Sequence, residues 1–286
     1  MNVLRASDPG FADRRARGTK PVPLAPKSPH SDAGTDQLVQ RLPLLWRKLG
    51  ESVPWTMPII EKGRWVANGG TRDMLHNLTF VYADPEAEGP VSDLVQKSLD
   101  EIEASGLPSL IALSRPPAKS IEVLEAAGYV QVSAQPFMRF DLAGLPLSAR
   151  DPLVRRLVPD DVAEAQAVAA EAFNFGLEPA ALAVPPKSAV NGLLWGLEVD
   201  GKLVSITVGG RAGSVVSLWT VATLPGEQHK NYGQRLKRAV HNDLAGRGVK
   251  EILEINSPAG TALNNRLGYE TLEILPFWTR RRWAIL

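Results

Sequence analysis

Two stretches of the sequence, residues 106–139 and 248–280, repeat the same order of features. Each contains a glycine, a strand, a Ser-Pro or Ser-x-Pro turn, a short helix and then Gly-Tyr. In both, Pro-Phe follows at the same interval, which separates Gly128 from Pro136 in the first stretch. A predicted helix ending in glycine precedes each stretch. Because self-similarity at a fixed spacing marks duplicated structural units, we predict two copies of one α/β (α+β) unit.

A segment of different composition precedes the two copies. Residues 1–34 are rich in proline, glycine and arginine and show no hydrophobic period, so they bury too little apolar surface to offset the entropy cost of ordering. We predict a flexible basic arm there, a first domain over residues 35–147 and a second over residues 148–286. The alternative for the arm is docking on a partner subunit, and a homodimer stays open.

Composition excludes several kinds of chemistry. The sequence has no cysteine, which removes disulfides, thiolate zinc sites and cysteine nucleophiles. Its four histidines are scattered without metal-ligand spacing, so we expect no metal, and we expect His241 at a helix surface. The net charge of +1 gives no field towards nucleic acid, and we find neither a bilayer-spanning apolar run nor a signal-peptide core. We therefore expect a cytoplasmic protein with no membrane partner and with nucleic acid disfavoured.

The second copy has the more legible order of elements. A strand and a helix with an acidic first turn occupy residues 154–173. Residues 193–223 contain two hairpin signals, Asp200-Gly201 and the glycine cluster 209–213, which predict three antiparallel strands. A loop, a helix, a strand, a short helix and two final strands, YETLEIL and WTRRRWAIL, follow. This order predicts a mixed, mostly antiparallel sheet flanked by helices in each domain.

The loop after the third of these strands has the chemistry of an anion site. It reads LPGEQHKNYGQ over residues 224–234, between an apolar strand and a helix. Backbone N–H groups at a helix N-terminus bind phosphate, and a glycine lets the backbone approach a ligand closely. We expect the N–H groups from His229 to Gln234 to hold a pyrophosphate, with close approach at Gly233 and positive charge from Lys230.

The order of elements and this loop resemble the GNAT acyltransferase family. That family carries Gln/Arg-x-x-Gly-x-Gly/Ala at the same junction, and Gln228-x-x-Asn231-x-Gly233 is similar to it. Asparagine replaces the first glycine, and it is the non-glycine residue that best tolerates a left-handed backbone. The late LGYE resembles the family's Leu-Gly-Phe ending. The resemblance covers residues 150–286 well and residues 36–145 more faintly.

The resemblance implies an acetyl-CoA-dependent N-acetyltransferase acting on a primary amine of a small molecule or a protein. Acetyl-CoA would be the cosubstrate, without a metal, and the edge of the strand before the loop would bind its pantetheine arm. The residues implied for the cofactor site are Val221, Ala222, Thr223, Gln228, His229, Lys230, Asn231, Tyr232, Gly233, Gln234 and Asn256.

The catalytic and acceptor residues are less defined. Many family members place a tyrosine four residues before the late glycine, where it can protonate the departing thiolate. Asn264 stands there, and its amide can hydrogen-bond the sulfur but has no proton to release. Glu171 is a candidate general base on position alone. The family's acceptor pocket lies between its first two helices, which implies Phe173 and Phe175 as lining residues, although core packing explains them equally well.

The corresponding loop of the first copy, residues 82–93, is acidic. Asp84, Glu86 and Glu88 would repel a pyrophosphate there, so we expect the first copy to bind no coenzyme A and to serve as scaffold, pocket wall or partner surface.

Two other functions of the chain stay open. Asn264 in place of the tyrosine suggests a non-enzymatic acetyl-CoA-binding sensor, and the arginine-rich arm suggests a module that binds a protein or nucleic acid.

Overall fold

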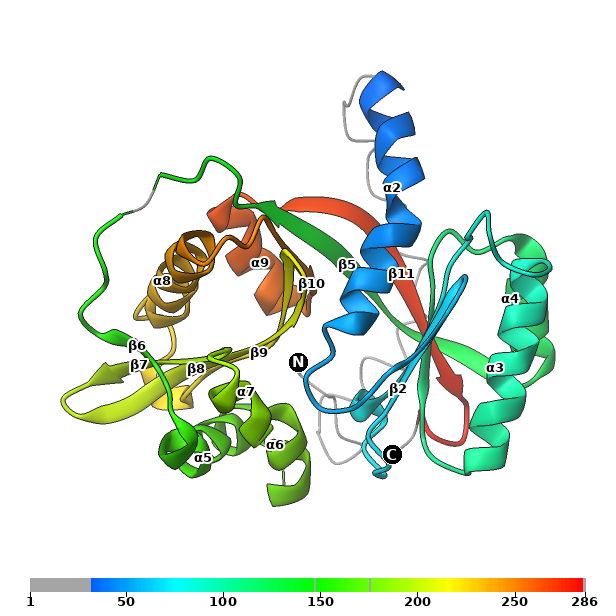
Figure 1. Cartoon of the computed structure of the whole chain (residues 1–286). Helices are drawn as coiled ribbons and strands as arrows, with labels where there is room; N and C mark the ends of the chain where they lie inside the picture. The colour runs from blue at the N-terminus through cyan, green and yellow to red at the C-terminus, as the bar shows by residue number, and fades with distance from the viewer. Residues whose placement is uncertain (1–31, 147, 175, 285–286) are drawn as a thin grey trace.

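The computed structural model describes residues 32–146, 148–174 and 176–284. The predicted arm therefore lies outside the described residues except for its last three positions, and so does Phe175. In the described chain, helices lie on both faces of an 11-stranded sheet (Figure 1). The fold class is the predicted one, a mixed sheet with mostly antiparallel pairs.

The first half begins with a long helix, α2 (Asp32–Glu51), whose leucines and tryptophan recur at helical spacing. Leu42, Leu45, Trp46 and Leu49 are all buried. The elements that follow are β1 (Ile59–Glu61), β2 (Arg64–Asn68), the short 3₁₀ helix η1 (Met74–His76), β3 (Asn77–Val81), α3 (Val91–Ser105), β4 (Leu110–Leu113), α4 (Ala118–Ala126) and β5 (Tyr129–Asp141). Figure 1 shows α3 and α4 side by side at one end of the molecule.

The second half follows the predicted order of elements except for two short helices ahead of the three antiparallel strands, which were not predicted, and for its last strand. Its elements are β6 (Val154–Arg156), η2 (Pro159–Asp161), α5 (Val162–Phe173), α6 (Leu177–Ala183), α7 (Pro186–Val190), β7 (Leu194–Val199), β8 (Lys202–Ala212), β9 (Val215–Thr223), η3 (Pro225–Glu227), α8 (Tyr232–Gly246), β10 (Glu251–Ile255), α9 (Pro258–Leu267) and β11 (Glu270–Arg280). In Figure 1, α8 and α9 lie on one side of the second-half strands and α5, α6 and α7 on the other.

The two halves exchange their last strands at the centre of the sheet. The strand order is β1-β2-β3-β4-β11-β5-β10-β9-β8-β7-β6. Thus β11 pairs with β4 of the first half, and β5 pairs with β10 of the second half, both antiparallel. Strands from both sides of the predicted boundary at residues 147 and 148 therefore share one sheet, and the division into two domains stays a prediction.

The two exchanged strands pair with each other in a nearly self-complementary register. Pro136 lies opposite Ile274, and Pro276 lies opposite Ala134. Since Pro136 and Pro276 occupy the same position of the sequence repeat, each copy makes the same contact with the other. A local two-fold relation between two copies of one unit would give this register, so it supports the predicted duplication.

The prediction of two final strands is wrong. A single strand, β11, runs from Glu270 through Pro276 to Arg280. Proline lacks a backbone donor and is tolerated in a strand near irregularities. The register with β5 shifts between Thr271 and Glu273 and again just after Phe277, so the proline lies between two such irregularities.

Both predicted hairpins are present, but the glycines play different roles in them. Asp200 and Gly201 both have positive φ, 52° and 74°, as a two-residue turn that matches strand twist requires. In the second hairpin the turn lies at Gly213, with φ 64°, whereas Gly210 is inside β8. A Cβ there would lie 1.7 Å from the carbonyl oxygen of Ser52, so this glycine lets the end of α2 dock on β8.

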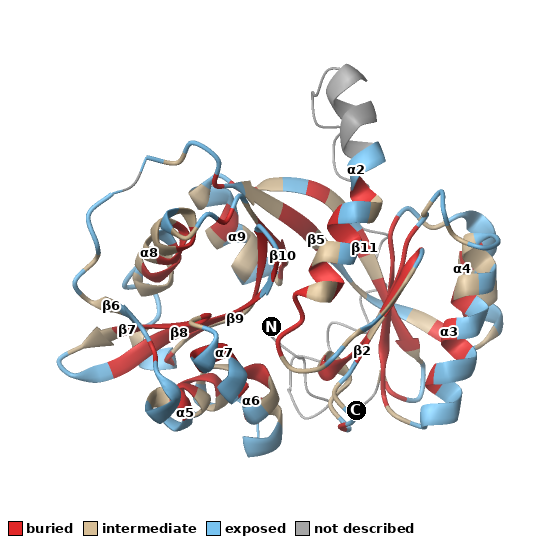
Figure 2. Cartoon of the chain, in the orientation of Figure 1, coloured by how far each residue is buried: buried red, intermediate tan, exposed pale blue. Residues whose placement is uncertain are grey.

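Buried side chains line both faces of the sheet along its length (Figure 2). Trp195 is 1% exposed, whereas Trp219 is only half-buried. In the described chain no single helix is long and apolar enough to cross a membrane. Two consecutive helical segments, 159–173 and 177–190, are together long and apolar enough for a membrane span, but the chain bends by 113° between them.

Candidate functional site

The parallel strands β9 and β10 diverge along their length. They pair only between Val215–Ser217 and Glu251–Leu253, although β9 continues to Thr223 and β10 to Ile255. Beyond this point β9 stays paired with β8, and β10 with β5, so each strand keeps a partner only on its outer side. The edges of β9 and β10 that face each other are consequently open.

A β-bulge lies where β9 leaves β10. Val208 pairs with Thr220, and the next residue, Gly209, pairs with Leu218, so Trp219 is an extra residue in β9. Such a bulge increases local twist and bends the strand. It explains why β9 turns away from its parallel neighbour directly after Ser217.

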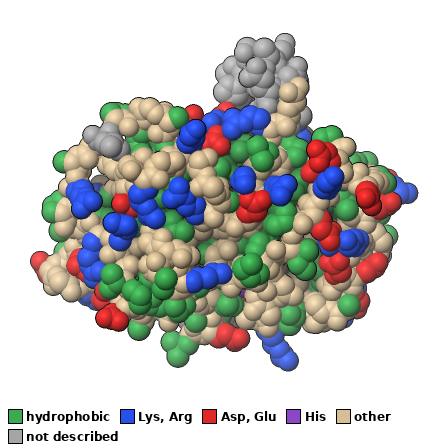
Figure 3. Space-filling view, in the orientation of Figure 1, with side chains coloured by type: hydrophobic (Ala, Val, Ile, Leu, Met, Phe, Trp, Pro, Cys, Tyr) green, Lys and Arg blue, Asp and Glu red, His purple; other side chains and the backbone are tan. Residues whose placement is uncertain are grey.

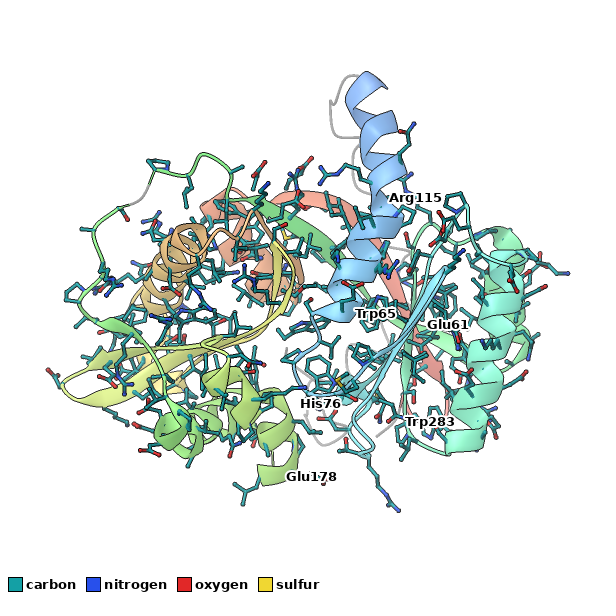
Figure 4. All side chains as sticks on the ribbon, viewed as in Figure 1. Glu61, Trp65, His76, Arg115, Glu178 and Trp283 are labelled. Atoms are coloured by element: carbon teal, nitrogen blue, oxygen red, sulfur yellow. The ribbon has the colours of Figure 1, made fainter. Side chains whose placement is uncertain are left out.

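Aromatic side chains of the first half cover this bulge. The Trp219 indole nitrogen donates to the carbonyl oxygen of Ser52 at 3.1 Å, and its ring meets Trp55 edge-on at 4.8 Å. Trp55 in turn contacts His76 at 5.5 Å between ring centroids. Figure 4 shows His76 and Trp65 in the middle of the molecule, so the first half forms a wall beside the diverging strands.

The loop that follows β9 offers a row of free backbone donors. His229 and Asn231 adopt left-handed φ values of 66° and 63°, and α8 begins directly afterwards. Within the described residues, the backbone N–H groups of residues 229–234 have no acceptor. Left-handed residues ahead of a helix N-terminus turn successive N–H groups towards one concave surface, which suits an anion. The predicted left-handed conformation of Asn231 is confirmed.

The fold itself has room for a side chain at Gly233. A Cβ there would lie 3.6 Å from the Thr223 hydroxyl oxygen and 3.8 Å from a methyl carbon of Leu263, both ordinary contact distances. Packing within the chain therefore does not require glycine at this helical position. Close approach of a ligand to the backbone is the remaining physical reason for it.

The charged side chains of the loop are already paired. The Lys230 ammonium lies 2.9 Å from the Glu227 carboxylate, which raises the pKa of the lysine. In the first turn of α8, Arg235 holds Asp151 with two hydrogen bonds of 2.8 and 2.9 Å. Lys230 would have to leave Glu227 to contact a bound phosphate, so the backbone donors, rather than this lysine, are the main anion-binding feature.

Two amides stand at the open edges of the strands. Gln228 donates from its side chain to the carbonyl oxygen of Thr223 at 3.3 Å and so fixes the end of β9. Asn256 follows β10, is 6% exposed, and its side-chain nitrogen has no acceptor within the described residues. A buried amide donor without a partner is costly to the fold, which makes this nitrogen a candidate ligand contact.

Asn264, the predicted catalytic residue, is fully buried in a polar network. Its amide nitrogen donates to Glu254 at 2.8 Å, and its oxygen accepts from Lys237 at 2.5 Å. The Tyr269 hydroxyl also donates to Glu254, at 2.8 Å. The predicted hydrogen bond from Asn264 to a cofactor sulfur would require one of the two amide contacts to break, so in this geometry the residue stabilises the core.

The prediction that His241 lies at the surface is wrong. It is 3% exposed, lies 2.9 Å from the Tyr269 hydroxyl and stacks on Phe140 at 4.5 Å. Burial and, secondarily, the Lys237 charge lower the pKa of the histidine to about 3. The sequence did contain a signal, because residues 237 and 241 share the helical face of Leu236 and Val240.

The other predicted residues lie at the end of α5. Glu171 is exposed there, and no hydrogen bond or ion pair of the described residues joins it to the loop. Phe173 is partly buried and packs against the second-half core. The helix ends at Asn174 in a left-handed conformation, with φ 55°, and Phe175 is outside the described residues. The base role of Glu171 and the lining role of the two phenylalanines stay predictions.

The corresponding strands of the first half do not diverge. β3 and β4 pair in parallel up to Val81 and Leu113, and Ser114 continues the ladder with a bond to the Val81 carbonyl at 2.9 Å. In the loop after β3, the Asp84 carboxylate accepts from the backbone N–H of Glu86 at 2.9 Å. A loop carboxylate thus occupies a donor that an anion would need.

Within the described residues, no group of three or more His, Asp or Glu side chains could hold a metal ion.

No family model and no curated protein sequence matches this chain. Among solved structures, it resembles a GCN5-related N-acetyltransferase from Kribbella flavida, at 14% identity and a TM-score of 0.59, over 86% of this chain and 95% of that one. A GCN5-related N-acetyltransferase from Sphaerobacter thermophilus is similar at 16% identity and a TM-score of 0.59, over 76% of each chain. The PaiA N-acetyltransferase from Thermoplasma acidophilum, solved with coenzyme A, is 14% identical with a TM-score of 0.38, and the match covers 44% of this chain and 97% of that one. The chain therefore has the fold of the GNAT superfamily, the GCN5-related N-acetyltransferases.

Proposed function

We propose that this chain is an acetyl-CoA-dependent N-acetyltransferase that acts on a primary amine. The observation that carries the proposal is the row of free N–H groups over residues 229–234, placed at a helix N-terminus directly beside the open edges of β9 and β10. This surface suits a pyrophosphate followed by an extended arm. The GNAT fold of the chain agrees with that ligand.

In this proposal the chain's own residues bind and orient the ligand. The N–H groups of the loop hold the pyrophosphate, and the open edge of β9 from Leu218 to Thr223 pairs with the amides of the pantetheine arm. The unpaired Asn256 nitrogen donates to a carbonyl of the same arm. Acetyl-CoA supplies the activated thioester, and the amine nitrogen attacks its carbonyl carbon as the thiolate leaves.

A non-enzymatic acetyl-CoA sensor is the second candidate. The specific observation in its favour is Asn264, which stands where many GNAT enzymes place a tyrosine and is engaged on both sides by Lys237 and Glu254. The Asn264 amide cannot donate a proton to a leaving thiolate. The sensor and the enzyme would share the same ligand and the same loop.

Turnover separates the two candidates. The full chain is incubated with acetyl-CoA and a panel of primary amines, while thiol release and acetylated products are followed, and binding is measured by calorimetry. The enzyme releases thiol only when an acceptor amine is present. Binding of acetyl-CoA without amine-dependent thiol release would favour the sensor. Absence of any acetyl-CoA binding would contradict both.

A further inference from the structure

A cavity of about 790 Å³ lies between the two halves, at the far end of β9 from the cofactor loop. It is bounded by residues 51–60, which join α2 to β1, and by α7 and the β8–β9 hairpin. Its size falls in the range of small-molecule sites, about 300–1,000 Å³. The nine residues of β9 separate its two ends by about 27 Å at strand spacing, so this cavity lies apart from the pyrophosphate-binding loop at the other end of the strand.

The inner part of the cavity is apolar. Val53 and Leu193 line it and are 6% and 5% exposed, and Ile60 adds a half-buried side chain. Gly209 and Gly210 present bare backbone to the same space. These residues come from both halves, so an aliphatic group in the cavity would be covered from two sides.

The rim of the cavity is cationic and incompletely paired. Lys187 is exposed, and its ammonium makes no ion pair or hydrogen bond within the described residues. Among the described residues, the Arg211 guanidinium donates only to backbone carbonyls, those of Gly213 at 2.7 Å and Arg247 at 3.5 Å. Arg247 also lines the cavity but has a carboxylate, Asp243, at 3.3 Å.

The Glu51 carboxylate, which also lines the cavity, does not pair with Lys187 or Arg211. Glu51 forms ion pairs with Lys48 at 2.7 Å and with Arg47 at 2.9 Å, both on its own helix. Ser188 also lines the cavity and is 2% exposed. Figure 3 shows Lys and Arg side chains gathered over the second half on the face in view.

We propose that this cavity binds a small amphipathic anion, an aliphatic carboxylate. The carboxylate contacts the Lys187 ammonium, the Arg211 guanidinium and the Ser188 hydroxyl at the rim. The aliphatic chain packs against Val53 and Leu193 inside. An unpaired lysine ammonium and a serine hydroxyl beside an apolar cavity give each part of such a molecule a complementary surface.

The test is a titration of the full chain with octanoate, with octylammonium and acetate as matched probes. Octylammonium has the same chain with the opposite charge, and acetate has the same charge without the chain. The variant Lys187→Glu/Arg211→Glu reverses the rim charges, and Lys202→Glu reverses an exposed lysine that does not line the cavity. Circular dichroism of each variant checks that the fold is retained.

We expect octanoate to bind more tightly than either probe, and the double variant to lose at least about tenfold in affinity while Lys202→Glu retains it. Four results would each overturn the proposal: no binding of octanoate, equal binding of octylammonium, an equal loss in Lys202→Glu, or displacement of octanoate by acetyl-CoA. Because the cavity lies at the other end of β9 from the loop, failure of this proposal leaves the pyrophosphate contacts of residues 229–234 unaffected.

Discussion

Asn231 and His229 differ in how well the sequence predicts their backbone conformation. Both residues are left-handed, with φ 63° and 66°. Asparagine is enriched in that conformation, so its place at a glycine position of the motif predicted the geometry. His229 gives no comparable signal, because it occupies a variable position of the motif rather than a glycine position. The second left-handed residue, which helps to turn the N–H groups to one side, could be found only from the structure.

Replacing Asn231 tests whether this backbone geometry serves binding. We expect Asn231→Gly to keep acetyl-CoA affinity, because glycine adopts positive φ freely. Asn231→Ala should lose about 1–2 kcal/mol, the cost of a left-handed alanine, either as weaker binding or as lower stability. Calorimetric titration and urea unfolding of both variants measure this. Equal behaviour of the two variants in both assays would contradict the assigned role.

Asn264 belongs to the core in this structure, which sets the outcome of its substitution. Asn264→Ala leaves buried atoms of Lys237 and Glu254 with one partner fewer, so we expect a loss of about 1–3 kcal/mol in the free energy of unfolding. Asn264→Tyr introduces a ring at a position that is 0% exposed, and we expect it to destabilise the fold rather than supply an acid. Unfolding in urea measures both, and a stable, more active tyrosine variant would contradict the placement.

The elements of the second half were largely predictable because each has a strong local signal. The turn Asp200-Gly201 fixed one hairpin, and the apolar spacing of α8 fixed that helix. The continuity of β11 was not predictable, because Pro276 reads locally as a strand break and only pairing with β5 carries the strand past it. Local sequence does not encode which distant strand supplies that pairing.

The buried face of α8 predicts how stability changes with pH. The pKa of His241 is about 3 in the fold, below the ordinary value of 6.5 for the unfolded chain. Between these values the unfolded state binds more protons, so stability is complete above pH 6.5 and is lost as the pH falls towards 3. The expected slope from this group is up to about 1.4 kcal/mol per pH unit.

Urea unfolding at pH 7, 6 and 5 measures this slope in the wild type and in His241→Gln, which keeps a side chain able to hydrogen-bond Tyr269. The variant should lose the part of the slope that the histidine contributes. The exposed His229→Gln is the matched control and should keep it. Equal slopes in all three proteins would show that His241 titrates alike in the folded and unfolded chains.

At the scale of the whole molecule, the repeat predicted a duplicated unit but not the exchange of β5 and β11 between the halves. The repeat pattern is the same whether a strand returns to its own half or crosses to the other, so the sequence leaves the two topologies open. The halves also differ in one feature that matters for binding. β9 and β10 diverge after Ser217 and Leu253, whereas β3 and β4 stay paired to Val81 and Leu113.

This asymmetry predicts about one acetyl-CoA per chain. In the part of the chain that the structure describes, only the second half combines open strand edges with free loop donors, and the acidic loop of the first half would repel phosphate. Calorimetry on a chain of known active concentration gives the stoichiometry. Two equivalent sites per chain would mean that the loop after β3 rearranges to bind the cofactor.

The central claim is that the backbone of residues 229–234 holds the pyrophosphate of acetyl-CoA, and Gly233→Val tests it most directly. The fold has ordinary contact space for a side chain there, so the variant should remain folded while its side chain blocks the ligand. The matched control is Gly246→Val, at the other end of α8, where a Cβ meets nothing within 4 Å. Calorimetric titration should give an affinity for acetyl-CoA at least about tenfold weaker in Gly233→Val, and unchanged in Gly246→Val. Full acetyl-CoA affinity in a folded Gly233→Val protein would contradict the account.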